Sequence, residues 1–257
     1  MISRVSHLKV QYARGLTQRK NRAAYQQFIV EGIRVIEEAE RAGQNPALVF
    51  FVPSQVENDA RAAALLKRLQ ARTDECHAVS ERVLGALSDT PHPQGIVAVY
   101  PFPALAIPPS PNMLLVLDAL RDPGNLGSIL RTAWAAGVDG VILTPTTADP
   151  FNPKEVRAAM GAHFSIPIEA RGWAEIEPQL ARIPRVYLAD ARGERDYTQV
   201  SWIRPFALIL SGEAGSARDD ASRVATERVR IPMPRHAESL NVAVAAGILL
   251  FAATRVA

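Results

Sequence analysis

Two polar side chains, Asn125 and Arg131, lie in a segment that is otherwise made of small and apolar residues. The apolar run 114–117 precedes them, and Gly124 opens the turn toward a helix on which Arg131 falls off the apolar stripe. A guanidinium has a pKa above about 12, so Arg131 is a poor base. It could instead stabilise a developing oxyanion or bind a phosphate through two hydrogen bonds. The structural alternative is that Asn125 only caps the helix and Arg131 is only a surface charge.

A second polar group follows another apolar run, residues 206–210. In the loop 211–215, Gly212 leaves the backbone open to the close approach of a flat ligand, and Glu213 supplies a carboxylate. The alternative is an ordinary turn in which Glu213 is simply solvated. A full dinucleotide-binding glycine pattern is absent from the earlier turn, where the spacing is only Gly124-x-x-Gly127.

A third polar group precedes the long apolar stretch at the end of the chain. The strand expected at 229–232 leads through 233–238 to Ser239, which is well placed to cap a helix. Capping by Ser239 leaves the amide of Asn241 unexplained at the start of an otherwise apolar helix. These two residues are therefore candidates for a site as well as for a helix start.

The elements that would position these groups alternate regularly along the second half of the chain. Near-continuous apolar strands separated by helices predict a parallel sheet that is covered on both faces. Ligands of such sheets bind at the carboxyl ends of the strands, where the three polar groups fall. The expected strands are 113–117, 140–143, 166–169, 185–189, 206–210 and 229–232, and the expected helices are 126–136, 153–159, 173–181 and 240–255.

Five prolines within residues 101–111 predict a stiff, extended linker, because proline supports neither a helix nor a central strand. We therefore expect a first domain over 1–103, a linker over 104–112 and a second domain over 113–257. The first domain alternates helix and strand signals and is expected to be a small α/β domain. Its expected helices are 23–42 and 58–69, and its expected strands are 47–52 and 95–100.

The first 30 residues carry six cations and no acid, although the net charge of the 257-residue chain is only +3. A basic segment of this kind is typical of proteins that bind phosphate backbones, but a solvated, frayed helix would have the same composition. The candidate phosphate-binding side chains are Arg14, Arg19, Lys20 and Arg22.

The composition excludes several classes of protein. With 48% hydrophobic and 21% charged residues, the chain reads as a soluble globular protein. The single cysteine, Cys76, permits no intrachain disulfide and fits a reducing cytoplasm. No secretory signal is expected, and the apolar run 240–253 is shorter than the roughly 20 residues that span a bilayer. Histidine, cysteine and acidic residues do not fall at metal-ligand spacing, and no Walker-type phosphate loop is present, so we expect neither a metal nor ATP hydrolysis.

Three segments, 117–133, 208–215 and 231–245, resemble in order and content the motifs of the SpoU (TrmH-like) RNA ribose 2′-O-methyltransferases of the SPOUT superfamily. The resemblance implies a parallel-sheet α/β domain with a C-terminal trefoil knot, S-adenosyl-L-methionine as cofactor, and a homodimer with its active site near the subunit interface. Segments 28–32 and 93–96 are similar to the RNA substrate-binding domain, itself like certain ribosomal proteins, that precedes the catalytic domain in many relatives.

The resemblance also implies roles for individual residues. Arg131 would act within its own chain or across the dimer. The implied catalytic residues are Asn125, Arg131, Glu213, Ser239 and Asn241, and the implied cofactor-binding residues are Gly212, Ile231, Met233 and Leu240.

The expected activity is transfer of a methyl group to a ribose 2′-hydroxyl in structured RNA. Ribosomal RNA is favoured over transfer RNA, because the additional N-terminal domain is more typical of relatives that act on the ribosome. Two other classes stay open: a non-catalytic RNA-binding or ribosome-assembly factor with the same fold, and a small-molecule methyltransferase.

Overall fold

The computed structural model describes residues 1–212, 217–235 and 237–255. The chain divides into two compact units, of which the first contains residues 1–103 and 149–164 and the second contains residues 104–148 and 165–257. The division at 103/104 falls within the proline-rich stretch. Glu213 lies outside the described residues.

The first unit is built on a four-stranded mixed sheet in the order β1-β4-β2-β3 within the described residues. The β1–β4 and β4–β2 pairs are antiparallel and β2–β3 is parallel. Apolar side chains cover both faces of the sheet. The strands are β1 (Gln27–Glu31), β2 (Leu48–Phe51), β3 (Cys76–Ala78) and β4 (Ile96–Pro101), and the helices are α1 (Leu8–Gly15), α2 (Arg19–Tyr25), α3 (Ile33–Arg41), α4 (Pro53–Glu57), α5 (Ala60–Gln70), α6 (Glu81–Leu87) and α8 (Pro153–Ala159).

The helix expected over 23–42 is wrong, because β1 interrupts it. Gln26 ends α2 in the left-handed conformation with φ 51°, and Gly32, with φ 98°, turns the chain from β1 into α3. Phe28 and Ile29 contribute to the cores on opposite faces of the sheet, and Phe28 pairs with Tyr100 of β4. The pairing of β1 with a distant strand therefore overrides the helical spacing of its apolar residues.

Residues 149–164, which were expected within the second domain, pack with the first unit. They contain α8 at its expected bounds, followed by a short 3-10 helix, Ala162–Phe164. The rings of Phe151 and Phe164 lie 5.0 and 5.6 Å from the ring of Phe28. This aromatic packing explains the placement, since large buried rings contribute strongly to a core.

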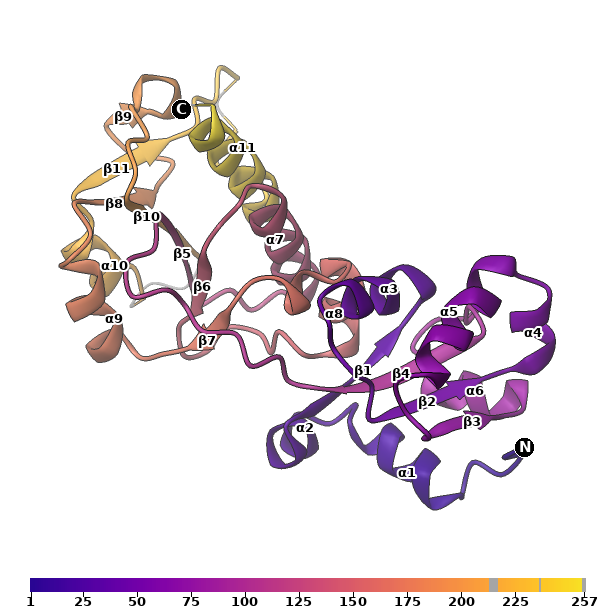
Figure 1. Cartoon of the computed structure of the whole chain (residues 1–257). Helices are drawn as coiled ribbons and strands as arrows, with labels where there is room; N and C mark the ends of the chain where they lie inside the picture. The colour runs from indigo at the N-terminus through magenta and orange to yellow at the C-terminus, as the bar shows by residue number, and fades with distance from the viewer. Residues whose placement is uncertain (213–216, 236, 256–257) are drawn as a thin grey trace. The chain divides into compact units, whose positions relative to one another are not determined.

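The second unit contains a seven-stranded sheet within the described residues, in the order β7-β6-β5-β10-β8-β11-β9. Every pair in it is parallel, as expected from the alternation of apolar strands with helices. Helices α7 and α11 pack side by side, away from α9 and α10 (Figure 1). The strands are β5 (Met113–Asp118), β6 (Gly140–Leu143), β7 (Ile168–Ala170), β8 (Arg185–Ala189), β9 (Arg195–Asp196), β10 (Phe206–Ser211) and β11 (Glu227–Arg230), and the helices are α7 (Pro123–Ala135), α9 (Trp173–Leu180), α10 (Ala217–Val224) and α11 (Val242–Thr254).

The proline-rich stretch at the start of the second unit is extended and anchored. The backbone N–H of Ile107 donates to Oε1 of Glu169 at 3.0 Å, and the Ile107 side chain is only 9% exposed. Gly140 makes room for that side chain, because a Cβ at this position would lie 2.6 Å from Ile107. Within the described residues, no helix is long and apolar enough to cross a membrane.

Arg22 was expected to contact phosphate, and the structure contradicts this. Its side chain is buried, and its guanidinium donates to the carbonyl oxygens of Leu16 and Thr17 at 2.7 and 2.8 Å and to the carboxylate of Asp149 at 2.5 Å. Arg22 therefore holds the turn between α1 and α2 and joins it to the segment 149–164.

We expect Arg22→Ala to lower the free energy of unfolding by about 3 kcal/mol, because the substitution leaves the half-buried Asp149 carboxylate without its main partner. Arg19→Ala is the matched control and should change stability by less than about 0.5 kcal/mol, since the Arg19 side chain is 76% exposed. Chemical denaturation of the three proteins measures both values. An unchanged free energy of unfolding in Arg22→Ala would contradict the structural role of Arg22.

Glu155 of α8 is a buried carboxylate that should make stability depend on pH. Its side chain is 0% exposed, and burial, with a smaller contribution from Asp149, raises its pKa from 4.5 to about 7. The groups that act on it are Asp149, Lys154 and Arg22, while the neighbouring His163 is buried with its pKa lowered by burial to about 4. Because the folded state binds the Glu155 proton more tightly than the unfolded state, stability falls as the pH rises from 4.5 to about 7.

Glu155→Gln should therefore be more stable than the parent protein above neutral pH, by about 2–3 kcal/mol, and equal to it near pH 4. The free energy of unfolding of each protein is measured as a function of pH, and the difference between the two curves gives the effect of Glu155 alone. The effect of His163, which has the opposite sign, cancels in this difference. A difference in the free energy of unfolding that stays constant from pH 4 to pH 8 would show that folding does not shift the pKa of Glu155.

Candidate active site

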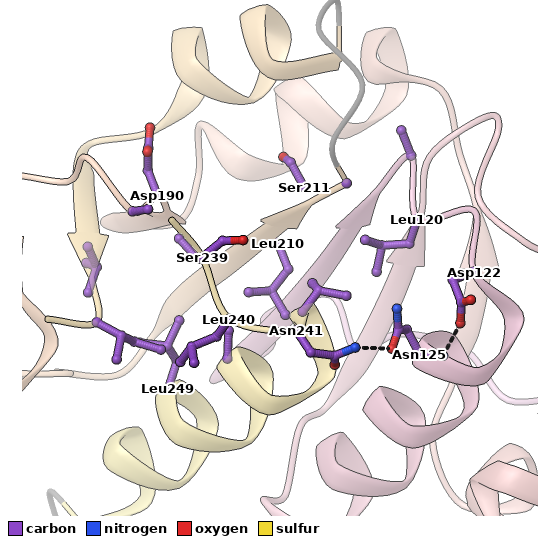
Figure 2. A pocket seen from close by; sticks show the side chains of 18 of the residues that line it. Leu120, Asp122, Asn125, Asp190, Leu210, Ser211, Ser239, Leu240, Asn241 and Leu249 are labelled. Atoms are coloured by element: carbon purple, nitrogen blue, oxygen red, sulfur yellow. Dashed lines mark hydrogen bonds between the residues drawn. The ribbon is translucent and has the colours of Figure 1, made fainter. Parts of the chain in front are cut away.

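A cavity of about 750 Å³ lies at the carboxyl edge of the parallel sheet in the second unit (Figure 2). It is formed by the segments that follow β5, β8, β10 and β11, together with the first turns of α7 and α11. Open parallel sheets bind ligands at this edge, because the strand-to-helix loops converge there.

Most of the residues expected at the site meet in this cavity. Glu213 lies outside the described residues. Those that line the cavity are Asn125, Gly212, Ile231, Met233, Ser239, Leu240 and Asn241.

Arg131 is exposed on α7 and is not among the residues that line the cavity. It lies six positions after Asn125, which corresponds to about 9 Å along the helix and about 240° around it. The two side chains therefore leave α7 in different directions. Within one chain the structure does not bring Arg131 to Asn125.

Asn241 links the start of α11 to the start of α7. Its Nδ2 donates to Oδ1 of Asn125 at 2.9 Å (Figure 2). Its own Oδ1 accepts from the backbone N–H groups of Ala243 and Val244 at 2.9 and 3.4 Å. Asn241 is thus the residue that caps α11, and Ser239 was wrongly expected in that role. Because α11 begins only at Val242, Ser239 is left facing the cavity.

Asn125 does not cap its helix either. The cap of α7 is Asp122, whose Oδ1 accepts from the backbone N–H of Asn125 at 2.9 Å, and Pro123 occupies the first helical position. The amide side chain of Asn125 is therefore not used in capping and reaches across to Asn241. This result rules out helix capping as the role of the Asn125 side chain.

Gly212 is required by a close approach between two backbone segments. Its N–H donates to the carbonyl oxygen of Asp118 at 2.8 Å, and a Cβ at position 212 would lie 2.4 Å from the carbonyl oxygen of Ala119. Ala119 itself has φ 53°. Any side chain at 212 would push the loop after β10 away from the loop after β5, and bare backbone forms the cavity wall there.

Two carboxylates of the site were missed in the sequence analysis. Asp118 ends β5 and is buried. Its Oδ1 accepts from the Thr144 hydroxyl at 2.7 Å and its Oδ2 from the Ser211 hydroxyl at 3.3 Å. Burial raises its pKa against these two hydrogen bonds. Asp118 therefore supports the loop beneath the cavity.

Asp190 follows β8 and lines the cavity on the side of Ser239, away from the Asn125–Asn241 pair (Figure 2). Its Oδ1 accepts from the backbone N–H of Arg192 at 2.9 Å, and its Oδ2 lies 3.7 Å from the Arg228 guanidinium. Both missed carboxylates stand at the end of an apolar run, and this signal was available in the sequence.

The cavity combines a polar end with an apolar wall. The wall suits the flat, weakly polar face of a heterocycle, and the amides suit hydroxyl groups. The described residues hold no group of three or more histidine, cysteine or acidic side chains that could bind a metal ion. The apolar wall is formed by Leu210, Val229, Ile231, Met233, Leu240 and Leu249.

Both parts of the chain match known protein families. Residues 112–251 match the SpoU rRNA Methylase family, and residues 8–98 match the MRM3-like substrate binding domain. The chain is 35% identical over 252 residues to the 23S rRNA (guanosine(2553)-2′-O)-methyltransferase RlmP of Bacillus subtilis, with 97% of each chain covered.

Solved structures with bound cofactor are similar over nearly the whole chain. The SpoU methyltransferase AviRb of Streptomyces viridochromogenes in complex with the cofactor AdoMet has a TM-score of 0.86 and 29% identity, covering 97% of each chain. The AdoMet-bound rRNA methyltransferase of Sinorhizobium meliloti has a TM-score of 0.83 and 32% identity, covering 99% of this chain and 97% of that one. Because the family model matches the unit that contains the cavity, and because the similarity to relatives extends over nearly the full length, the chain belongs to the SpoU rRNA methylase family.

Proposed function

We propose that the chain transfers a methyl group from S-adenosyl-L-methionine to a ribose 2′-hydroxyl of structured RNA, with large-subunit ribosomal RNA as the substrate. The observation that carries the proposal is the meeting of Asn125 and Asn241 beside an apolar wall at the strand ends of a SpoU-family unit. The similarity to RlmP, named as a 23S rRNA 2′-O-methyltransferase, supports the choice of RNA.

The cavity suits the proposed cofactor. Its volume of about 750 Å³ leaves room for the cofactor and part of a nucleotide. Ile231, Met233 and Leu240 would hold the adenosine, and Gly212 would let its backbone approach the ligand. S-adenosylmethionine supplies a methyl group on a positively charged sulfur.

A trefoil knot is part of the proposal. It is supported by two contacts that bring late segments against the first strand-to-helix connection: Gly212 against Ala119, and Asn241 against Asn125. A C-terminal segment that returns to an earlier loop in this way is what such a knot requires.

The side chains of the cavity would position the target ribose. The amides of Asn125 and Asn241 can accept and donate hydrogen bonds to its hydroxyl groups, and Ser239 adds a hydroxyl on the same wall. Because the 2′-hydroxyl is a poor nucleophile at neutral pH, its developing negative charge needs a partner, and the Arg131 guanidinium would stabilise it or hold the adjacent phosphate. Glu213 is proposed to organise the site from the loop that follows Gly212.

Arg131 is proposed to act across a homodimer interface. It does not line the cavity of its own chain, so a second copy would have to supply it. Helix α11 supports this arrangement: it is apolar all round, yet Val244 and Phe251 on one stripe are 51% and 47% exposed. A helix that is apolar on every face is normally buried, and a second copy would cover the stripe.

The N-terminal unit is proposed to recognise RNA through its exposed cations Arg14, Arg19 and Lys20. A reducing cytoplasm is the proposed location, in agreement with the lone Cys76. Transfer RNA as substrate, and a non-catalytic RNA-binding factor, are the alternatives that the first experiment separates.

That experiment incubates the purified chain with methyl-labelled S-adenosylmethionine and unmodified large-subunit ribosomal RNA, small-subunit ribosomal RNA or transfer RNA. Nucleoside analysis of the product should find one 2′-O-methylated nucleoside, in the large-subunit RNA only. Label on a base would overturn the ribose assignment. Label in transfer RNA alone would overturn the substrate, and cofactor binding without label in any RNA would support the non-catalytic alternative.

Arg131→Ala should reduce methyl transfer by at least about 100-fold and leave cofactor binding within a few-fold, since the guanidinium acts on charge that develops in the transition state. Mixed dimers identify the chain from which it acts. Arg131→Ala chains are co-expressed with chains carrying Asn125→Ala and Asn241→Ala, under two affinity tags, and the heterodimer is purified.

If Arg131 acts across the interface, the heterodimer regains one complete site and measurable activity, whereas each variant alone is inactive. A heterodimer as inactive as its parents would show that Arg131 acts within its own chain.

A further inference from the structure

Three side chains of the first unit form an exposed strip that the proposed chemistry does not use: Leu8, Tyr12 and Tyr25. Leu8 is 81% exposed and Tyr25 is 55% exposed, while Tyr12 between them is half-buried. Leu8 and Tyr12 lie one turn apart on the same face of α1. Large apolar side chains exposed next to one another are more informative than single ones.

The ring of Tyr25 rests on a fixed support. It is the last residue of α2, and its ring meets the ring of Tyr12 edge to face, with centroids 5.0 Å apart and an interplanar angle of 64°. The Tyr12 hydroxyl donates to Oε1 of Gln27 at 2.8 Å, which orients the supporting ring. Tyr25 is thus held in place while more than half of it stays open to solvent.

The start of α2 is also held. Nδ2 of Asn21 donates to the carbonyl oxygen of Gly15 at 2.8 Å, and the buried Arg22 binds the carbonyl oxygens of Leu16 and Thr17. These bonds tie α2 to the end of α1. A binding surface across the two helices would therefore be largely formed before any partner arrives, which lowers the entropic cost of binding.

The charged side chains that α1 and α2 themselves carry are all positive. Arg14 at the end of α1 and Arg19 and Lys20 at the start of α2 are exposed, and residues 1–30 contain no acid. Two carboxylates approach from elsewhere. Glu75 pairs with Lys9 of α1, and Asp149 lies 4.0 Å from Nε of Arg19, although its closer partner is Arg22 at 2.5 Å. The two helices therefore expose an aromatic ring and, in other directions, three cations. Arg19 and Lys20 lie about 240° and 140° around α2 from Tyr25, so they would meet phosphates further along the RNA strand than those next to the stacked base.

We propose that Tyr25 stacks on an unpaired base of the RNA, with Arg14, Arg19 and Lys20 holding phosphates of the same RNA. The proposal rests on the proposed function only in taking RNA as the partner. Aromatic side chains beside cations bind single-stranded RNA in this way, and a base within a duplex does not expose its face. An unpaired base fits this surface better than a protein partner because the charged side chains that α1 and α2 carry are all positive.

The test compares binding of two RNAs without methyl donor: a short stem-loop with an adenine loop, and a fully paired duplex of the same length. Tyr25→Leu keeps an apolar side chain but removes the ring, and Tyr25→Phe keeps the ring. Tyr25→Leu should weaken stem-loop binding by about 5- to 100-fold and leave duplex binding unchanged, while Tyr25→Phe should bind as the parent protein does. The salt dependence should not change in either variant, because no phosphate contact is lost.

Arg19→Ala is the matched control on the same helix. It should weaken binding to both RNAs and reduce the slope of log K against log salt concentration by about one. A 2-aminopurine placed in the loop gives a direct signal: the parent protein should quench its fluorescence, and Tyr25→Leu should not.

Unchanged stem-loop binding by Tyr25→Leu would overturn the proposal, and so would an equal loss on both RNAs. A change in the oligomeric state of Tyr25→Leu with RNA binding unchanged would assign the strip to contact between copies and overturn it as well. Failure of the proposed function would look different. If the parent protein quenches the fluorescence of the loop base but methylates no RNA, the stacking proposal is supported and the proposed methyl transfer is contradicted.

Discussion

The site depends on one side chain, Asn241, which takes part in two structures at once. Its side-chain oxygen Oδ1 accepts hydrogen bonds from two backbone N–H groups in the first turn of α11. Its side-chain nitrogen Nδ2 donates to Asn125 at the start of α7. A cap must stand at the first turn of a helix, so the position of α11 fixes the position of the amide. Two segments separated by more than a hundred residues are thereby joined at the polar end of the cavity.

The rest of the second unit makes that meeting possible. The parallel order of β5, β10, β8 and β11 places the ends of these strands along one edge, and Gly212 lets the loop after β10 lie directly on the backbone of Ala119. Asp118 is buried beneath the same loops and is held by two hydroxyl groups. The cavity therefore has a hydrogen-bonded floor and an apolar wall, and the amide pair lies at one end.

Much of the second unit could be predicted from the sequence, because its apolar strands and helices follow one another with little ambiguity. All six expected strands are present, with ends that shift by up to two residues, and the parallel sheet is confirmed. The identity of the cap of α11 could not be predicted, since Ser239 and Asn241 are both good caps and only the backbone path decides between them. Arg22 looked like its exposed neighbours in sequence, and its burial depends on Asp149, which lies 127 positions away.

The N-terminal unit was predicted less well for the same reason. The apolar residues of β1 have spacings that also suit a helix, and the strand forms because β4 pairs with it from about 70 residues further along the chain. The segment 149–164 joins this unit through aromatic packing on Phe28, which no local pattern encodes. Local patterns were therefore sufficient where the apolar spacing suited one kind of element, and long-range contacts decided the segments where it suited two.

The most direct test of the role of Asn241 is methyl transfer by Asn241→Ser, with Asn241→Ala measured beside it. Serine caps a helix about as well as asparagine but is too short to reach Asn125, so the variant separates the two tasks of the residue. We expect Asn241→Ser to melt within a few degrees of the parent protein, to bind S-adenosylmethionine within a few-fold and to transfer methyl at least about 10-fold more slowly. Asn241→Ala should show the same kinetic loss and also lose about 1 kcal/mol of stability. Transfer at the parent rate by Asn241→Ser would mean that the residue is only a helix cap and would contradict a role for its amide in methyl transfer.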